Sequence, residues 1–211
     1  MGFDLTGLNP TVNKIYPQRY NDIMKEYGAD GWLDWQKDIP EDVKDEYFEL
    51  KDQYQTDNPG DYFRNNVWWW RPLWEFVCNS CNDFLTEGDI SKGFYNDGKK
   101  ISKTKSVKIA KRLFELIADG TVDAFHREES LKRAKAKIHN DIVREEMDKI
   151  RDACHKEHGK NLVPANYPEP YKQQWDDAYA KEDWAESYPF DRDNVENFAT
   201  FCLQSGGFEI S

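Results

Sequence analysis

The sequence predicts a mainly α-helical α+β protein, in which a few short strands accompany a helical domain. Several segments carry apolar residues at helical spacing, with glycine or proline between them. Aromatic residues make up 15% of the chain although all hydrophobic residues reach only 38%, so Trp, Tyr and Phe must supply most of the buried surface. A length of 211 residues suits a single domain, 1–211, with a long charged helical insertion.

The N-terminal part of the chain predicts one strand and two helices. The opening MGFDLTGLNP favours a strand near 2–6, because glycine and proline interrupt any helical pattern. Helices are expected over 18–27 and 41–55. The second has apolar residues at i, i+4, i+7 and i+11, which form one stripe on a charged helix: Val43, Tyr47, Leu50 and Tyr54.

The middle of the chain begins with a break at Asn58-Pro59-Gly60. The aromatic segment YFRNNVWWWRPLW follows at 62–74, and Pro72 suits the first turn of a helix that runs to Phe84. The turn signal Asn96-Asp97-Gly98 then predicts a hairpin, with short strands inside 94–102.

Helical patterns dominate the second half. Ser102 or Ser106 is expected to cap a helix that ends at Gly120. The charged stretch 129–158 has a thin apolar stripe and predicts one helix about 45 Å long, or two helices with a break near Asn140. The remaining elements are a helix near 171–185, a last helix that begins at Asp191 or Asn194 and stops at Gly206, and a strand at 208–210.

Charge and cysteine content exclude some classes of function. A net charge of −11 opposes binding to the phosphate backbone, so nonspecific binding to duplex nucleic acid is not expected. No apolar run is long enough to span a membrane, and no signal peptide is evident. Four cysteines are too few for a disulfide framework and are interpreted as reduced thiols, which predicts a cytoplasmic protein.

Two segments carry the candidate binding residues. Tryptophan faces can stack on nucleobases, and arginine can bind phosphate. The basic run 99–112 contains seven positive residues and no acid, and it lies at a helix start, where free N–H groups favour anions. The alternatives are that the rings form the core and that the lysines form a solvated helix face. The expected ligand residues are Arg64, Asn65, Trp68, Trp69, Trp70, Arg71, Lys99, Lys100, Ser102, Lys103 and Lys105, provided that both segments converge on one cavity.

Cofactor and catalytic signals are weak. Cys78, Cys81, Cys154 and His158 offer ligands of the type that zinc takes, but Cys78 and Cys81 lie in a helical pattern and are better interpreted as buried thiols. We therefore predict no cofactor. No spacing of histidines and acids is typical of a catalytic triad or a metalloprotease, and no P-loop pattern is present, so no catalytic residue is assigned.

Four blocks of the sequence resemble an uncharacterised family of bacteriophage accessory proteins: MGFDLTGLNP, DYFRNNVWWWRPLWEFVCNSC, GFYNDGKKISKTKS and YPFDRDNVENFATFCLQSGGFEIS. They cover somewhat under half of the chain. The resemblance implies a viral origin and a role in the host cytoplasm, and it implies no catalytic residue. On this basis, 11–58 and 121–187 are interpreted as insertions on a core formed by 1–10, 59–120 and 188–211.

Three functions follow as hypotheses. The first is an accessory protein that binds, and thereby sequesters, a nucleotide-like phosphorylated ligand. The second is an acidic interaction module that inhibits a host protein involved in defence or in nucleic-acid binding. The third is a hydrolase acting on nucleotides. A binding role is favoured over catalysis, and the oligomeric state is left open.

Overall fold

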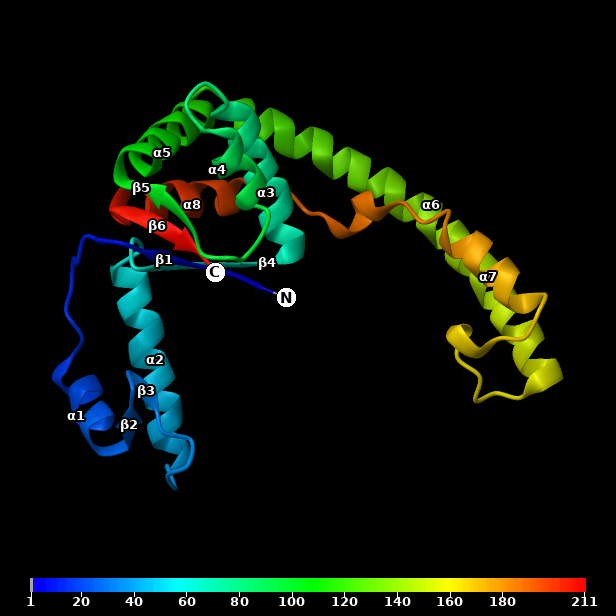
Figure 1. Cartoon of the computed structure of the whole chain (residues 1–211), viewed down its shortest axis with the longest axis horizontal. Coiled ribbons are helices and arrows are strands. Elements are labelled where there is room, and N and C mark those ends of the chain that lie inside the picture. The colour runs from blue at the N-terminus through cyan, green and yellow to red at the C-terminus, as the bar shows by residue number, and fades with distance from the viewer. Residues whose placement is uncertain (1) are drawn as a thin grey trace. The chain divides into compact units, whose positions relative to one another are not determined.

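The computed structural model describes residues 2–211, which form helices α1 to α8 and a small antiparallel sheet, so the predicted mainly-α α+β class is confirmed. The chain divides into two compact units. Unit 1 combines the chain up to Thr121 with Arg192–Ser211, and unit 2 is Val122–Asp191 (Figure 1). Unit 2 occupies nearly the range interpreted as the insertion 121–187. That interpretation, like the single domain and the insertion at 11–58, stays a prediction.

Unit 1 is built on a four-stranded sheet with the strand order β4-β1-β6-β5. The strands are β1 Gly2–Gly7, β4 Tyr62–Asn66, β5 Lys99–Ser102 and β6 Gly207–Ile210. Leu5 of β1 pairs with Phe63 on one side and Ile210 on the other, so the first and last strands lie together in the middle of the sheet. The predicted strands near 2–6 and 208–210 are confirmed.

The hairpin expected within 94–102 is only partly present. The strand begins at Lys99, and Phe94 and Tyr95 follow the short helix α4, Glu87–Lys92, instead of forming a strand. Thr86 and Asp89 form a capping box at the start of this helix, with each side chain bonded to the other's backbone N–H. Because no strand forms at Phe94 and Tyr95, β5 does not pair with a strand close to it in the sequence. It pairs with β6, at the far end of the chain.

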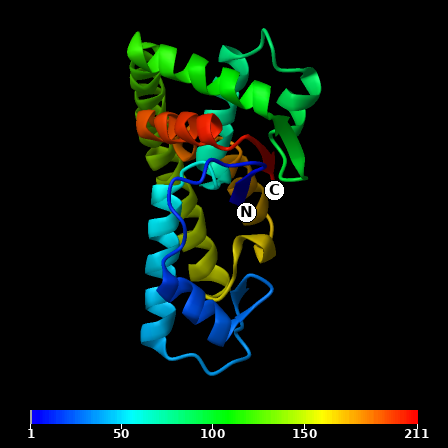
Figure 2. The ribbon, with the colours of Figure 1, turned by 90° about the vertical axis from the view of Figure 1, so that its left-hand side faces the viewer.

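Three helices cover one side of the sheet (Figure 1): α3 Val67–Ser80, α5 Lys103–Ala118 and α8 Arg192–Gln204. Figure 2 shows α5 and α8 packed side by side. Their buried faces include Leu113 and Phe198. Of the two predicted caps, Ser102 and Ser106, it is Ser102 that caps α5, and its side chain accepts a hydrogen bond from Lys105 N–H. Gly120 and Gly206 adopt positive φ angles of 82° and 65° beyond the two helix ends, as expected for stop residues.

Helix α3 begins five residues before the predicted position. The Asn66 side chain accepts hydrogen bonds from the backbone N–H groups of Trp68 and Trp69, which caps the helix there. Pro72 therefore lies inside α3 and not in its first turn, and the helix ends at Ser80, before Phe84. The prediction of a start at Pro72 was wrong because a side-chain cap outweighed the proline signal.

The segment between β1 and β4 forms a small cluster of its own. Helices α1, Gln18–Tyr27, and α2, Glu41–Asp57, confirm the two predicted helices. A two-stranded hairpin, β2 Gly28–Ala29 and β3 Trp32–Leu33, lies between them in the sequence. The buried residues of this cluster are Tyr20, Ile23, Leu33, Ile39 and Tyr47.

Unit 2 consists of a long helix and a returning segment. Helix α6 runs from Thr121 to His158 without interruption. It begins eight residues before the predicted start at 129, and the suggested break near Asn140 is absent. Asn140 is buried, and its amide bonds to the backbone O and N of Asp183 at 2.9 and 2.8 Å, which satisfies it inside a continuous helix. The helix expected over 171–185 is shorter: α7 spans Tyr171–Tyr179, and single 3-10 turns lie at Pro164–Asn166 and Trp184–Ser187.

Candidate functional site

The aromatic segment divides between core and surface. Trp70 and Trp74 are fully buried and stacked with ring centroids 5.3 Å apart. Their indole N–H groups donate to the carbonyls of Gly93 and Ile90 at 2.8 and 3.1 Å. A Cβ at Gly93 would lie 2.1 Å from the Trp74 ring, so this close approach requires glycine. Trp70 is thus a core residue, and its assignment to a ligand site was wrong.

The other residues of this segment lie in several environments. Trp68 is 41% exposed and Trp69 is half-buried, both in the first turn of α3. Arg71 is exposed on the same helix. The Asn65 side chain donates to Asn194 Oδ1 at 3.1 Å, which ties β4 to α8. None of these four residues lines the pocket that Arg64 lines in the described structure.

The basic run is largely bound to carboxylates of the same unit. Lys99 Nζ lies 2.8 Å from Asp89 Oδ1, and Lys105 Nζ contacts Asp89 Oδ2. Burial alone would raise the pKa of Asp89, but the hydrogen bonds from Lys105, Lys99 and Thr86 outweigh it and lower that pKa well below its usual range. Lys100 forms an exposed pair with Glu209 at 3.4 Å. Ser102 serves as a helix cap, and Lys103 is exposed.

The two predicted segments do not converge. Arg64 lies on β4 and Lys99 lies on β5, which are the opposite edges of the sheet. Three strand spacings separate these edges, roughly 14 Å. The prediction of a shared cavity was wrong, because β1 and β6 lie between β4 and β5 in the sheet. The sequence does not indicate this strand order.

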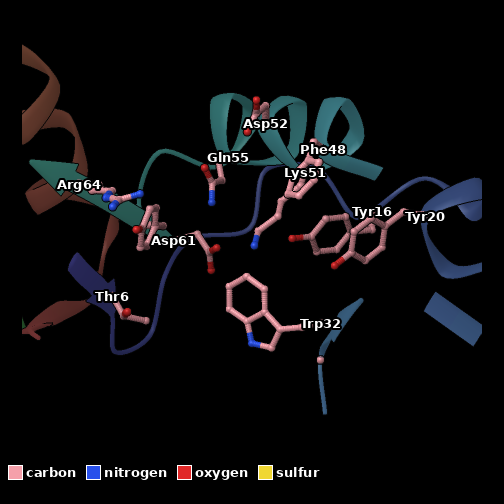
Figure 3. Close-up of a pocket in the computed structure, with 12 residues that line it drawn as sticks. Thr6, Tyr16, Tyr20, Trp32, Phe48, Lys51, Asp52, Gln55, Asp61 and Arg64 are labelled. Carbon is pink, nitrogen blue, oxygen red and sulfur yellow. The ribbon is translucent and has the colours of Figure 1, made fainter. Parts of the chain in front are cut away.

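Arg64 instead lines a different pocket, which has a volume of about 520 Å³ (Figure 3). Its walls come from β1, α1, the β2–β3 hairpin, α2 and β4. The lining is aromatic and charged at once: Thr6, Tyr16, Tyr20, Gly31, Trp32, Phe48, Lys51, Asp52, Gln55, Asp61, Tyr62 and Arg64.

Lys51 is the central cation of this pocket. Its Nζ lies 3.6 Å from the centroid of the Trp32 ring, which is a cation-π contact. Burial lowers the pKa of Lys51, and the nearby Asp52 and Asp61 only partly oppose that effect. Within residues 2–211, no carboxylate oxygen lies within 4 Å of this ammonium group. A partly buried cation therefore rests on a ring, and no carboxylate of the described residues contacts it directly.

Asp61 is the corresponding anion. Burial raises the pKa of its carboxyl group, with Lys51 acting in the opposite direction. Its backbone is held firmly, since its N–H donates to Asn58 O at 3.0 Å and its carbonyl accepts from Gly7 N at 2.9 Å. Figure 3 shows the carboxylate and the Lys51 ammonium directed into the same space. In the described part of the chain, the Asp61 carboxylate accepts no hydrogen bond.

Three further side chains of the pocket are held in place by their neighbours: Tyr62, Arg64 and Tyr16. The Tyr62 hydroxyl donates to Asp4 Oδ1, and burial raises the pKa of Tyr62 to about 12. Arg64 Nε lies 3.5 Å from the same Asp4 oxygen. Tyr16 stacks between Tyr20 and Tyr54 at centroid distances of 3.8 and 3.7 Å. Burial also raises the pKa of Tyr16, so the hydroxyls of Tyr16 and Tyr62 are both neutral at physiological pH.

Trp32 and Lys51 were missed at the sequence level. One signal was available: Asp30 and Gly31 have positive φ angles of 50° and 85°, as a tight hairpin turn requires, and Asp-Gly is typical of that turn. The turn places Trp32 on β3. No local pattern links Trp32 to Lys51, because the two residues meet only when the hairpin packs against α2.

The thiols are buried and separate from this pocket. Burial raises the pKa values of Cys78 and Cys81 to about 12, so both are neutral thiols. Cys154 is also buried, and His158 lies 3.4 Å from Glu157. Among residues 2–211, no three His, Cys, Asp or Glu side chains are grouped as ligands of a metal ion. The structure gives the zinc candidates no support.

Comparison with known proteins found no matching family model, no similar curated protein and no similar solved structure. The phage resemblance therefore stays an expectation. None of the helices in the described chain combines the length and the apolar composition that crossing a bilayer requires.

Proposed function

We propose that unit 1 binds a small planar ligand with an anionic group, of the nucleotide type, in the pocket beside Trp32. The observation that carries the proposal is the Lys51 ammonium group, which lies in that pocket on an aromatic ring and, among residues 2–211, without a carboxylate partner. Such a cation gains a charge-assisted hydrogen bond when a phosphate or carboxylate binds. Arg64 supplies a second cation at the same pocket.

The rest of the lining suits a planar ring. Trp32 is 60% exposed, so much of its surface is open for stacking although Lys51 contacts it. Asp61 adds an acceptor for ring N–H or amino groups. A ligand that has both a hydrogen-bonding ring and an anionic group would satisfy Lys51 and Asp61 together, whereas inorganic phosphate would satisfy Lys51 alone.

Sequestration of such a ligand in a host cytoplasm is part of this proposal. It rests on the phage resemblance, and it predicts that bound ligand is recovered unchanged after denaturation. A hydrolase would release a product of different chromatographic mobility.

Calorimetry against nucleoside monophosphates, cyclic nucleotides and inorganic phosphate tests the binding step. We expect saturable binding of at least one nucleotide, tighter than that of inorganic phosphate. The Lys51→Gln variant should bind about ten- to a hundredfold more weakly, which corresponds to one charge-assisted bond. Lys100→Gln is the matched control, because that lysine is exposed on the opposite edge of the sheet.

Two results would overturn the proposal: no saturation by any nucleotide at millimolar concentration, or equal binding by wild type and Lys51→Gln. Since the chain contains eight tryptophans, fluorescence titrations need a Trp32→Phe variant to assign the signal. The ligand-dependent change should disappear in that variant.

A second candidate function is docking of a protein partner on the same part of unit 1. Trp35 is 64% exposed and stacks on Phe48, with centroids 6.3 Å apart. Exposed aromatic side chains of this kind are enriched at protein interfaces. Trp35 does not line the pocket, so Trp35→Ala separates the two functions. It should weaken nucleotide binding much less than Lys51→Gln does, because Trp35 reaches the pocket only through Phe48, and it should abolish binding of a protein partner.

A further inference from the structure

Helix α6 carries two apolar stripes on different faces. One includes Val143 and Met147, which are buried against Ala178 and Trp175 within unit 2. The second consists of Leu131, Ile138 and Ile142, which are 65%, 66% and 65% exposed, together with the exposed Ala134. Positions 131, 134, 138 and 142 share one face of a helix, so they form a continuous strip about 16 Å long.

This strip is unusual for a charged helix. Single exposed leucines or isoleucines are common on protein surfaces, but three large aliphatic side chains in line mark a contact surface. A shallow depression, lined almost entirely by apolar atoms, continues the strip at its Leu131 end; His126, Arg127, Ser130 and Leu131 form it. The strip therefore combines protruding side chains with a depression that can accommodate a side chain of a partner.

Opposite charges lie one turn beyond the two ends of the strip. Arg127 lies four residues before Leu131, and Glu145 lies three residues after Ile142, both on the same face. Both are exposed, and neither forms an ion pair within the part of the chain that the structure describes. Other ionised residues of α6, such as Lys137 and Asp141, pair along the helix at 2.7 Å.

We propose that this strip is the contact surface between two copies of the chain, paired with their α6 helices antiparallel. Setting Leu131 level with Ile142 of the second copy also brings Arg127 within one residue, about 1.5 Å along the axis, of Glu145 of that copy. The two-fold symmetry repeats both contacts. A parallel pair would instead place Arg127 beside Arg127, so the charges select the antiparallel arrangement.

The interface is small, so the dimer is weak. A strip of three large aliphatic side chains is smaller than a standard specific interface, and we expect a dissociation constant on the order of 10–100 µM. Sedimentation equilibrium of the full chain, from about 1 µM to several hundred µM, covers that range. The wild type should pass from monomer to dimer.

Four variants test the surface and the orientation. Ile138→Glu should abolish the dimer and leave the circular dichroism spectrum and melting temperature unchanged, because this side chain is exposed. Arg127→Glu and Glu145→Arg should each weaken the dimer about tenfold by setting like charges opposite one another. The double variant Arg127→Glu/Glu145→Arg should restore wild-type association, because both cross-contacts are again between opposite charges.

The proposal is overturned if the wild type stays monomeric at the highest concentration and low salt, or if Ile138→Glu still dimerises. A double variant that is weaker than both single variants would rule out the antiparallel arrangement. None of these measurements uses a nucleotide, so they are independent of the ligand proposed for unit 1.

Discussion

Two places in unit 1 gather positive side chains, and they differ in what those side chains contact. Lys99 and Lys105 share the buried carboxylate of Asp89. Lys51 rests on the ring of Trp32 and has no carboxylate within 4 Å in residues 2–211. The sequence suggests the opposite ranking, because the run at 99–112 is dense in lysine and Lys51 lies among acids. A dense cationic run is a weaker indication of a binding site when a buried anion pairs with its lysines, as Asp89 does with Lys99 and Lys105.

The two carboxylates of these regions make the same point. Asp89 is buried and Asp61 is partly buried, and in both cases the loss of water contacts raises the pKa of the carboxyl group. Two lysines and Thr86 reverse that effect at Asp89, whose pKa is lowered. Asp61 has only the more distant Lys51, and its pKa stays raised. Asp89 therefore stabilises the fold as an anion, whereas Asp61 does not.

The largest effect on stability is expected from the buried tryptophans. Trp70→Ala should lower the free energy of unfolding by about 3–5 kcal/mol, because it removes a fully buried ring and leaves a cavity. Trp32→Ala should cost less than about 1 kcal/mol, since that ring is mostly exposed. Urea unfolding of both variants measures the difference. Equal losses would show that Trp32 is a structural residue and not part of a binding surface.

Asp89→Asn should have the next largest effect. It should lower the free energy of unfolding by about 2–4 kcal/mol at pH 7, because two lysines lose their buried partner. The lowered pKa of Asp89 means that its ionisation stabilises the fold above its unfolded pKa of about 3.9. This stabilisation is lost as the pH falls through the lower folded value.

The difference between wild type and Asp89→Asn should therefore shrink below about pH 4. Asp61→Asn is the control: the raised pKa of Asp61 means that its ionisation opposes folding, so this variant should be as stable as wild type, or more stable, at pH 7. Chemical unfolding from neutral to acid pH measures both. A pH-independent loss in Asp89→Asn would contradict the ionic role of Asp89.

The proposed binding site should show its own pH dependence. The pKa of Lys51 is lowered, so the ammonium group loses its proton at a lower pH than an ordinary lysine. Anion affinity should decline as the pH rises toward about 10, the ordinary lysine range. In Lys51→Gln the weaker affinity should stay flat over the same range, because Arg64 remains charged. Calorimetric titrations at several pH values measure how the affinity of both proteins depends on pH. An identical dependence in both would mean that a group other than Lys51 causes it.

The smallest effect is expected at Lys100, whose ion pair with Glu209 is exposed. Lys100→Gln should change the free energy of unfolding by less than about 0.5 kcal/mol, as is usual for a surface pair. Thermal denaturation at low and high salt measures it. A larger, salt-sensitive loss would mean that the β5 edge depends on its surface charges as well as on Asp89.

Local patterns predicted much of the fold. Helix α5 was predicted with a cap at Ser102 or Ser106 and a stop at Gly120, because spacing, cap and glycine all act within a few residues; the structure selects Ser102. The strands at both chain ends were also predicted. Strand β4 was missed, since Arg64 and Asn65 give it no apolar alternation. The predicted start of helix α3 was wrong because the Asn66 cap, and not Pro72, determines where the helix begins.

The sequence by itself determined the helical class, the central role of the aromatic residues and the helical character of the charged region within α6. Periodicity and composition carry that information locally. Only the tertiary structure decided which tryptophans are buried, which lysines are neutralised and which residues share a pocket. Asp89 meets Lys105, and Lys51 meets Trp32, through strand order and helix packing. Such contacts depend on pairing between distant segments, for which neighbouring residues provide no signal.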